Sequence, residues 1–356
     1  MNDQEMIFNA PEAVEDTPAM PAGECEAVSL PTSEVERFSE RVGAVKAELA
    51  KDVVGQSDII ENVIIAIISG GNVLLEGVPG VGKTRLVRSL GKVLSLPFSR
   101  IQFTPDLMPS DVTGTNVVEK DESGRLVTKF REGPIFANLV LADEINRATP
   151  KTQSAMLEVM QEHKVTVNNV SYKIDEPFFV LATENPIEQD GTYPLPEAQM
   201  DRFMFKLIVK FPSKEELVGI VRMTQVTMAE TAEAVIGGED ILAMRALAAT
   251  VPVADEVLSY AVNIVSNTHP ELDLSPASAK KYVKYGASPR AAQGLITAAK
   301  VRALMKGRFN VSYEDVIALA TPILRHRIKV NYAAVNDKLT TDDVISMIVK
   351  ETPKGR

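Results

Sequence analysis

Residues 77–84 read Gly-Val-Pro-Gly-Val-Gly-Lys-Thr, a motif whose spacing predicts binding of a nucleoside triphosphate. Glycines in such a loop let backbone N–H groups close around phosphate oxygens, and the N-terminus of a following helix adds partial positive charge. Lys83 can reach the outer phosphates, and the Thr84 hydroxyl can bind Mg²⁺. The predicted phosphate-binding residues are Gly77, Val78, Pro79, Gly80, Val81, Gly82, Lys83 and Thr84.

The residues on either side of this loop supply the context that the motif needs. Residues 73–75 form an apolar run typical of a buried strand, and Leu86, Val87 and Leu90 recur at helical spacing. The alternative is a glycine-rich turn that matches the motif by chance. A strand before the loop and a helix after it make that alternative much weaker.

A pair of carboxylates forms the second group of candidate residues. Asp143 and Glu144 directly follow an apolar run at residues 139–142. Ligands of open parallel sheets bind beyond the carboxyl ends of the strands. Asp143 is suited to hold Mg²⁺, directly or through a water, and Glu144 to orient and deprotonate an attacking water. The other interpretation, a strand that ends in two surface acids, is disfavoured because Lys83 and Thr84 lie upstream.

A third candidate comes from residues 182–186, which read Ala-Thr-Glu-Asn-Pro after another apolar run. A side-chain amide at this place can donate to the γ-phosphate and accept a hydrogen bond from the attacking water. Asn185 is therefore a candidate catalytic residue. Alternatively, Asn185 only caps the turn into Pro186.

These side chains need a scaffold, and short apolar runs alternate with helical periodicity between residues 73 and 209. This alternation predicts an α/β fold with a parallel sheet covered by helices on both faces. The predicted strands are 73–76, 98–102, 139–143, 178–183 and 205–209, and the predicted helices between them are 86–94, 152–161 and 196–202. Two hairpins should interrupt the alternation, one pairing 115–119 with 126–130 and the other pairing 164–167 with 170–174 across Asn168 and Asn169.

The pattern also predicts how the chain divides into domains. Residues 1–34 are acidic and proline-containing with little periodicity, which indicates a disordered tail. The α/β core follows at 35–212, and a helical linker at 213–237. Helical periods then indicate an all-helical second domain at 238–335, with 270–285 as a break, and a C-terminal extension at 336–356.

Composition limits the partners that the chain can use. It has 48 acidic and 38 basic residues, a net charge of -10, whereas proteins that bind duplex DNA usually carry a basic excess. The single cysteine, Cys25, allows no disulfide framework and suits a reducing cytosol, so we expect a cytoplasmic protein. No apolar run approaches the roughly 20 residues of a membrane span, and the acidic start lacks the basic region of a secretory signal. Three histidines disfavour a histidine-built metal site, which leaves ATP and Mg²⁺ as the predicted cofactors.

Together the motifs resemble those of the MoxR family of AAA+ ATPases. The glycine loop is followed in order by residues 141–144, 182–186, 195–203 and 286–290, and the spacing matches from about residue 53 to residue 328. The resemblance implies a five-stranded P-loop AAA+ nucleotide domain followed by an all-helical lid domain. It further implies a homo-oligomer, usually a hexameric ring, in which both hairpins project toward the axial pore.

The resemblance also implies roles for individual residues. Asn185 matches the residue called sensor 1. Arg290 matches sensor 2, a lid arginine that reads the γ-phosphate, unless it only caps the preceding loop. Arg202 matches the arginine finger that completes a neighbouring subunit's site; the alternative is a helix-end salt bridge with Glu197 or Asp201.

Two further positions match the family with less definition. Val54 and Gly55 resemble the segment that lines the adenine pocket, where contacts are mostly backbone and apolar. Arg147 recurs in the family, but the sequence assigns it no role.

The family implies a chaperone-like remodeller or metal-insertion helper for protein clients, often beside a partner with a von Willebrand factor A domain. A competing interpretation is a nucleic-acid motor or replication switch, and a third is a regulatory ATP-binding module without turnover. The predicted hairpins mix acidic and basic residues, which favours protein clients over nucleic acid, and Glu144 argues against a module that only binds. The acidic tail could tether a partner or act as a solubilising extension.

Overall fold

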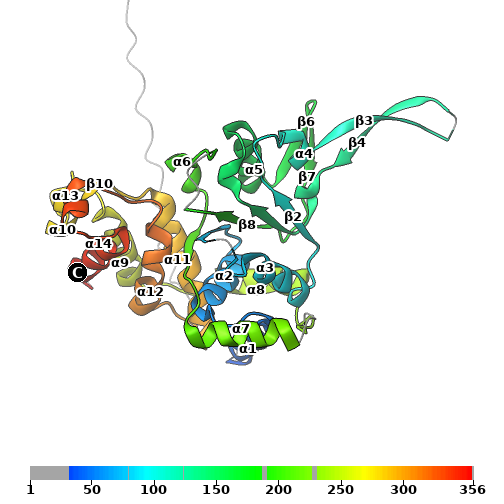
Figure 1. Ribbon diagram of the computed structural model, residues 1–356. Coiled ribbons are helices and arrows are strands. Elements are labelled where there is room, and N and C mark those ends of the chain that lie inside the picture. The colour runs from blue at the N-terminus through cyan, green and yellow to red at the C-terminus, as the bar shows by residue number, and fades with distance from the viewer. Residues whose placement is uncertain (1–31, 79, 123, 187–190, 227–230, 355–356) are drawn as a thin grey trace, which may run out of the picture.

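The computed structural model describes residues 32–78, 80–122, 124–186, 191–226 and 231–354. At the centre of the protein lies a five-stranded sheet in the order β2-β5-β8-β1-β9, and all neighbouring strands run parallel (Figure 1). Its strands are β1 (Val73–Gly77), β2 (Phe98–Gln102), β5 (Leu139–Asp143), β8 (Phe179–Glu184) and β9 (Phe205–Val209). The five predicted strands and their parallel arrangement are confirmed.

Helices cover both faces of this sheet, as the strand–helix alternation predicts. One face packs against α1 (Thr32–Asp52), α2 (Ser57–Ser69) and α3 (Lys83–Val93), and the other against α4 (Pro109–Thr113) and α5 (Pro150–Glu162). Successive side chains of β1 point to opposite faces of the sheet. Val73 and Leu75 belong to the hydrophobic cluster on the α1–α3 face, and Leu74 belongs to the cluster on the α4–α5 face. Short helical segments complete this domain: η1 (Pro134–Phe136), η2 (Ile145–Arg147) and α6 (Glu197–Met200).

Both predicted hairpins are present. The longer one pairs β3 (Gly114–Lys120) with β4 (Leu126–Glu132) and extends far from the sheet (Figure 1). The shorter one pairs β6 (Lys164–Val167) with β7 (Val170–Lys173), and its turn residues Asn168 and Asn169 have φ values of 48° and 64°. The rings of Phe130 and Tyr172 stack with centroids 3.9 Å apart, so the two hairpins support each other.

The second domain is built from seven elements of helix and one short strand pair. Its helices are α8 (Gly238–Ala249), α9 (Asp255–Ser266), α10 (Ala277–Tyr282), α11 (Pro289–Met305), α12 (Tyr313–Leu324), α13 (Tyr332–Asn336) and α14 (Thr341–Glu351). An antiparallel pair, β10 (Val283–Tyr285) with β11 (Lys329–Val330), adds the strands that the helical periodicity did not indicate. Among the described helices, none combines the length and apolar character that a bilayer crossing demands.

Three expected boundaries differ from the structure. Helix α1 begins at Thr32, so residues 32–34 are helical, because Val35 and Phe38 are buried and Glu34 favours a helix N-terminus; residues 1–31 lie outside the described part. The expected break at 270–285 contains α10 and β10. Helix α14 packs on α10 and α12 through Val344, Ile345 and Ile348, so most of the expected extension belongs to the helical domain.

The expected linker is only partly helical. Helix α7 (Lys214–Val226) ends before the undescribed residues 227–230, and residues 231–237 have no regular structure. The Asp52 carboxylate at the end of α1 accepts hydrogen bonds from the backbone of Thr231 and Ala232, at 2.8 and 3.3 Å. These bonds hold the returning chain along α1 on its way to the helical domain.

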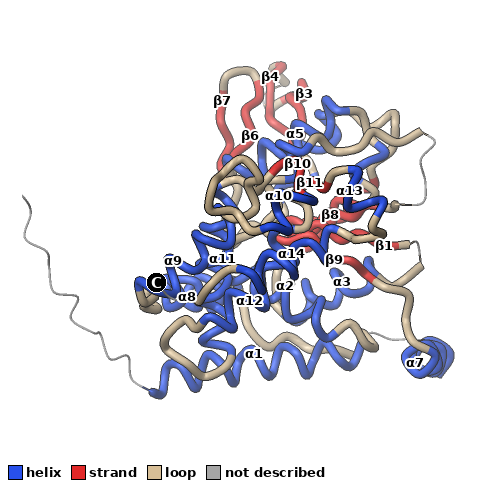
Figure 2. The backbone as a smooth tube through the Cα atoms, turned by 90° about the vertical axis from the view of Figure 1, so that its left-hand side faces the viewer, coloured by secondary structure: helices blue, strands red, loops and turns tan. Residues whose placement is uncertain are grey.

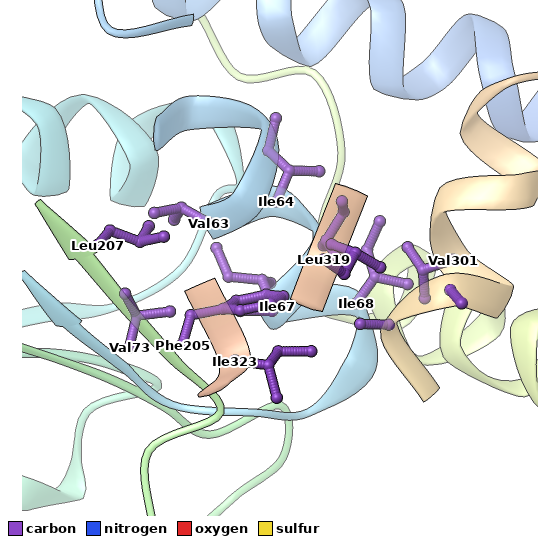
Figure 3. Packing of buried hydrophobic residues seen from close by; sticks show 14 of the residues in the cluster. Val63, Ile64, Ile67, Ile68, Val73, Phe205, Leu207, Val301, Leu319 and Ile323 are labelled. Carbon is purple, nitrogen blue, oxygen red and sulfur yellow. The ribbon is translucent and has the colours of Figure 1, made fainter. Parts of the chain in front are cut away.

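The helical domain and the sheet domain share one hydrophobic core. Figure 3 shows Ile67 and Ile68 of α2 among Phe205 of β9, Leu319 of α12 and Val301 of α11. Because α2 lies between the sheet and these helices, the helical domain docks beside the sheet. In Figure 2, α8, α9 and α11 of the helical domain lie on the left, whereas the end of β1, α3 and α7 lie on the right.

Candidate active site

The glycine loop lies between β1 and α3, which is the context that the motif requires. A Cβ on Gly77 would lie 2.8 Å from the carbonyl oxygen of Val209, so the approach of β9 demands a glycine there. Gly80 and Gly82 have φ values of +84° and +86°, which glycine adopts without strain. Pro79 lies outside the described residues. Helix α3 begins at Lys83, so its N-terminus points into the loop.

The Lys83 side chain folds back onto the glycine loop. Its Nζ donates a hydrogen bond of 2.6 Å to the carbonyl oxygen of Gly77. Burial lowers the pKa of Lys83, and the carboxylates of Asp143, Glu144 and Glu184 oppose that effect. The ammonium group therefore lies among acids, close to the place where a phosphate would enter.

Asp143 is buried at the carboxyl end of β5 and is held on both of its oxygens. Oδ1 accepts from the Thr183 hydroxyl at 2.6 Å, and Oδ2 accepts from Nε and an amino group of Arg100 at 3.0 and 2.6 Å. Thr183 lies on β8 and Arg100 on β2, the two strands that flank β5. The sheet order thus fixes the Asp143 carboxylate in one orientation.

Glu144 is the first residue after β5 and has a left-handed backbone, with φ 57° and ψ 49°. Its backbone N–H donates to the Thr183 hydroxyl at 2.8 Å, so one threonine ties both acidic residues. The Glu144 carboxylate accepts from the side-chain amide of Gln102 at 2.9 Å and lies 3.1 Å from the Arg147 guanidinium. Arg147, which had no predicted role, therefore pairs with the candidate base.

The donor set at this edge of the sheet fits a bound Mg²⁺. The Asp143 carboxylate and the Thr84 hydroxyl offer hard oxygen ligands, and substrate phosphates would supply others. Within the described residues, no group of three or more histidine, cysteine, aspartate or glutamate side chains gathers to form an all-protein metal cage. Few protein ligands together with substrate oxygens is the arrangement that Mg²⁺ prefers.

Asn185 follows β8 and is buried. Because β5 and β8 are neighbours in register, with Ala142 opposite Ala182, Asn185 lies at the same edge of the sheet as Asp143. The structure thus brings the glycine loop, Asp143, Glu144 and Asn185 to the carboxyl ends of three adjacent strands. The roles assigned to these residues stay predictions.

The predicted adenine segment lies against the glycine loop. The Gln56 side chain donates to the carbonyl oxygen of Val81 at 3.1 Å, which links the two segments. Gly55 has a φ of +72°, and a Cβ there would collide with Glu216 of α7. Val54 packs near Gly219 of the same helix. A base pocket formed by Val54 and Gly55 remains a prediction, with α7 as its neighbour.

Arg202 and Arg290 lie together near the amino end of β1, whereas the glycine loop lies at its carboxyl end. Both line a cavity of about 310 Å³ whose wall also includes residues 69–72, directly before β1. The glycine loop starts at the other end of this five-residue strand, roughly 15 Å away at about 3.3 Å per residue. The structure therefore does not bring either arginine to Lys83 of the same chain.

The contacts of Arg202 and Arg290 differ from the alternatives considered for them, a helix-end salt bridge for Arg202 and a loop cap for Arg290. Arg202 donates to the carbonyl oxygen of Leu157 at 2.9 Å. The two carboxylates considered as its partners bind other cations: Glu197 pairs with Lys329, and Asp201 pairs with Arg290 at 3.3 Å. Arg290 thus contacts the residue beside Arg202.

Several residues of the site were not singled out from the sequence. Thr183 lies inside the Ala-Thr-Glu-Asn-Pro motif, but nothing in the local pattern distinguishes its hydroxyl from the neighbouring polar side chains. Arg100 and Gln102 alternate on β2 as a period-two pattern, which places both on one face of the strand. Their nearness to the two acids depends on β2 being the neighbour of β5, which no local pattern indicates.

Comparison with family models connects this arrangement to known proteins. The model described as "ATPase family associated with various cellular activities (AAA)" matches residues 72–205, from the start of β1 to the first residue of β9, with both hairpins. The model described as "AAA lid domain" matches residues 276–348, from α10 into α14.

Relatives extend the match over most of the chain. "Chaperone MoxR1" of Mycobacterium tuberculosis is 43% identical over 303 residues, which is 85% of this chain and 79% of that protein. "Uncharacterized protein YeaC" of Bacillus subtilis is 40% identical over 311 residues, or 86% and 93% of the two chains. "Protein MoxR" of Paracoccus denitrificans is 29% identical over 325 residues, or 83% and 91%.

A solved structure agrees with the fold. A crystal structure described as that of a candidate ATPase from Cytophaga hutchinsonii superimposes with a TM-score of 0.84 at 38% sequence identity. The match covers 91% of this chain and 98% of that one, so the arrangement of both domains recurs there.

Proposed function

The chain belongs to the MoxR family of AAA+ ATPases, and from that premise we propose that it hydrolyses ATP with Mg²⁺ at a site shared between two copies of the chain. One observation carries this proposal. The residues suited to bind and hydrolyse a triphosphate lie beyond the carboxyl end of β1, while Arg202 and Arg290 lie at its amino end. A head-to-tail ring would bring the two sets together, one from each neighbour. We propose a hexamer in the cytoplasm.

Within one copy, each residue has a distinct task. The glycine loop and the N-terminus of α3 bind the phosphates, and Lys83 exchanges the Gly77 carbonyl for the outer phosphates. Thr84 and Asp143 would hold Mg²⁺, which supplies charge neutralisation when bound. Glu144 takes a proton from the attacking water once it leaves Gln102 and Arg147, and Asn185 orients that water.

The neighbouring copy supplies the two arginines. Guanidinium groups stay charged and fork onto phosphate oxygens, which suits the charge that develops during phosphoryl transfer. Arg290 lies beside Arg202, and this place favours action on the γ-phosphate of the neighbour's nucleotide. Loss of the γ-phosphate would release both arginines and let adjacent copies move.

We propose that this motion remodels protein clients or helps to insert a metal into them, beside a partner with a von Willebrand factor A domain. The β3–β4 hairpin supports protein clients, because Val118 and Leu126 expose 65% and 71% of their surface. Its charged residues are of both signs, and the chain has a net charge of -10. A motor that tracks phosphates needs cations to displace counterions, so a nucleic-acid motor is the weaker alternative.

The experiment uses mixed rings. Arg202→Ala copies keep an intact glycine loop, and Lys83→Ala copies keep intact arginines, so each should be inactive alone. Mixing them should restore part of the ATP turnover, because some interfaces then combine both intact halves. Native mass spectrometry confirms mixed assembly. Absence of recovery in proven mixed rings would overturn the shared site.

A further inference from the structure

Helix α12 of the lid is followed directly by Arg325, His326 and Arg327. These three residues bind the main chain of the sheet domain. His326 Nε2 donates to the Phe203 carbonyl oxygen at 3.0 Å, and Arg325 donates to the Lys206 carbonyl oxygen at 3.2 Å. We call these three residues the lid clamp. Neither the proposed catalytic chemistry nor the motifs read from the sequence use them.

Arg327 is the centre of the lid clamp. Its side chain is only 3% exposed, and all five of its N–H donors are used. Nε donates to the Asp201 carboxylate at 2.8 Å, and one amino group donates to the carbonyl oxygens of Asp201 and Phe203 at 3.0 and 2.7 Å. The other amino group donates to the carbonyl oxygens of Met204 and Ile323, at 3.1 and 2.5 Å.

The gripped segment is the one that carries Arg202. Arg327 holds the carbonyl oxygens of the residues on either side of it, Asp201 and Phe203, so the backbone of Arg202 is fixed to the lid from both directions. Helix α6 ends at Met200, and the next residues continue only as hydrogen-bonded turns, in which the Arg202 N–H donates to the Gln199 carbonyl oxygen at 3.2 Å. The backbone on both sides of Arg202 is therefore tied to the lid, while its guanidinium contacts Leu157 of α5.

Asp201 connects Arg290, the second arginine proposed to act on the neighbour's nucleotide, to Arg327 of the lid clamp. Its carboxylate accepts from Arg327 and from the Ser288 hydroxyl on the same oxygen, at 2.8 and 2.7 Å, and from Arg290 on the other at 3.3 Å. Burial acts to raise the pKa of Asp201, but the bonds from Ser288 and Arg327 outweigh it and hold that pKa below its usual value. Asp201 thus remains an anion between Arg290 and Arg327.

We propose that the lid clamp is a positioning device, through which the lid sets the placement of Arg202 for the neighbouring copy's nucleotide. The clamp itself contacts no nucleotide. This inference rests on the shared site proposed above. If the lid moves when its own subunit changes nucleotide state, the clamp carries that movement to the next subunit in the ring.

The test variant is Arg327→Lys, which keeps the charge opposite Asp201 but offers three donors instead of a planar fork. Misplacing a catalytic group by about 1 Å can cost up to about 100-fold in rate. We expect kcat to fall about 10- to 100-fold. Binding of a fluorescent ADP analogue should change less than about 3-fold, because the glycine loop is untouched.

Mixed rings then separate positioning from mere structural damage. Arg327→Lys copies mixed with Lys83→Ala copies should regain activity, because the second supplies a well-placed Arg202 to the first. Arg327→Lys copies mixed with Arg202→Ala copies should regain none, because both lack that arginine in place. Recovery in the second mixture would overturn the inference while leaving the shared site intact.

Two comparisons complete the experiment. Arg302→Lys weakens a salt bridge of 2.6 Å to Asp315 wholly inside the lid, so it should lower Tm without reproducing this mixing pattern. His326→Phe removes one bond to Phe203 and puts a somewhat larger apolar ring in place of the imidazole. If Arg327→Lys does not assemble, His326→Phe should show the same mixing pattern with a smaller loss of kcat, and recovery with Arg202→Ala would contradict the clamp. Full activity of Arg202→Ala alone would instead refute the shared site.

Discussion

Asp143 and Glu144 are each bonded to a polar side chain of β2, so the proposed function requires both carboxylates to change partners when a nucleotide binds. Arg100 holds Asp143 and Gln102 holds Glu144, through hydrogen bonds of 2.6 to 3.0 Å. Lys83 is likewise turned to the Gly77 carbonyl. Under the proposed function, nucleotide and Mg²⁺ would replace these internal bonds.

Replacing Glu144 with glutamine tests its role as the base. Glu144→Gln keeps the size of the side chain but cannot accept a proton, so ATP turnover should fall by about 10²–10⁴. Binding of ATP should stay within a few-fold, whereas Lys83→Ala should lose most binding. Single-turnover hydrolysis and nucleotide titration measure the two effects. Near-normal turnover by the glutamine form would remove Glu144 from the mechanism.

Replacing Arg100 tests whether it competes with Mg²⁺ for Asp143. The Arg100 side chain is 46% exposed, so its ion pair contributes only about 0–1 kcal/mol. Arg100→Ala should accordingly reach half-saturation at about 2- to 5-fold lower Mg²⁺, measured by the Mg²⁺-dependent affinity for a fluorescent ADP analogue. Arg100→Lys, which retains a cation, is the control. An unchanged Mg²⁺ requirement in both variants would show that the pair is incidental.

The β3–β4 hairpin is the element that we propose contacts a client. It extends away from the sheet, is supported at its base by the stacking of Phe130 on Tyr172, and exposes Leu126 and Val127. Exposed apolar side chains on an extended ribbon suit unfolded polypeptide, which can bury them.

Serine at positions 126 and 127 should therefore weaken client binding. The double change Leu126→Ser and Val127→Ser removes apolar area near the turn, and affinity for a labelled unfolded polypeptide should fall about 10-fold by fluorescence anisotropy. Basal ATP turnover should remain within about 2-fold. Lys129→Ser on the same strand should leave affinity unchanged at moderate salt. If the lysine change were the more harmful, electrostatic binding would replace the apolar interpretation.

For the molecule as a whole, the shared core and the lid clamp make the two domains one mechanical unit. The lid docks on α2 and β9 through buried apolar side chains, and its clamp adds charged bonds to the segment before β9. His326 is buried at this junction. Burial lowers its pKa well below the usual value, and the nearby charge of Arg327 adds to the effect.

This histidine predicts how stability depends on pH. Its folded pKa lies below the value of about 6.5 in the unfolded chain, so its contribution is complete above pH 6.5 and is lost as pH falls toward the folded pKa. The free energy of unfolding should drop by on the order of 1 kcal/mol between pH 7.5 and 5.5 from this group. His326→Gln, compared by urea unfolding at both pH values, should show a smaller drop. Equal drops in the two proteins would assign the pH dependence elsewhere.

The glycine loop, the two acids, Asn185 and all five strands were predictable from sequence, because each depends on local spacing: phosphate loops need glycines in fixed order, and buried strands need short apolar runs. Local spacing also predicted both hairpins. In the β6–β7 hairpin the signal is the Asn168–Asn169 turn, because asparagine tolerates positive φ. The partners of those residues depend instead on which strands are neighbours. Arg100 and Gln102 meet Asp143 and Glu144 only because β2 lies beside β5.

The docking of the lid was the feature that tertiary structure alone decided. The sequence indicates helical periods in residues 238–335, but not which surface the buried sides of these helices pack against. Packing of α11 and α12 on α2 places Arg290 beside Asp201 and away from Lys83 of its own chain. The contacts of residues 325–327 with the sheet domain also depend on this docking. They are far in sequence from 201–206, and long-range packing fixes such contacts through burial summed over the whole core, which no local pattern records.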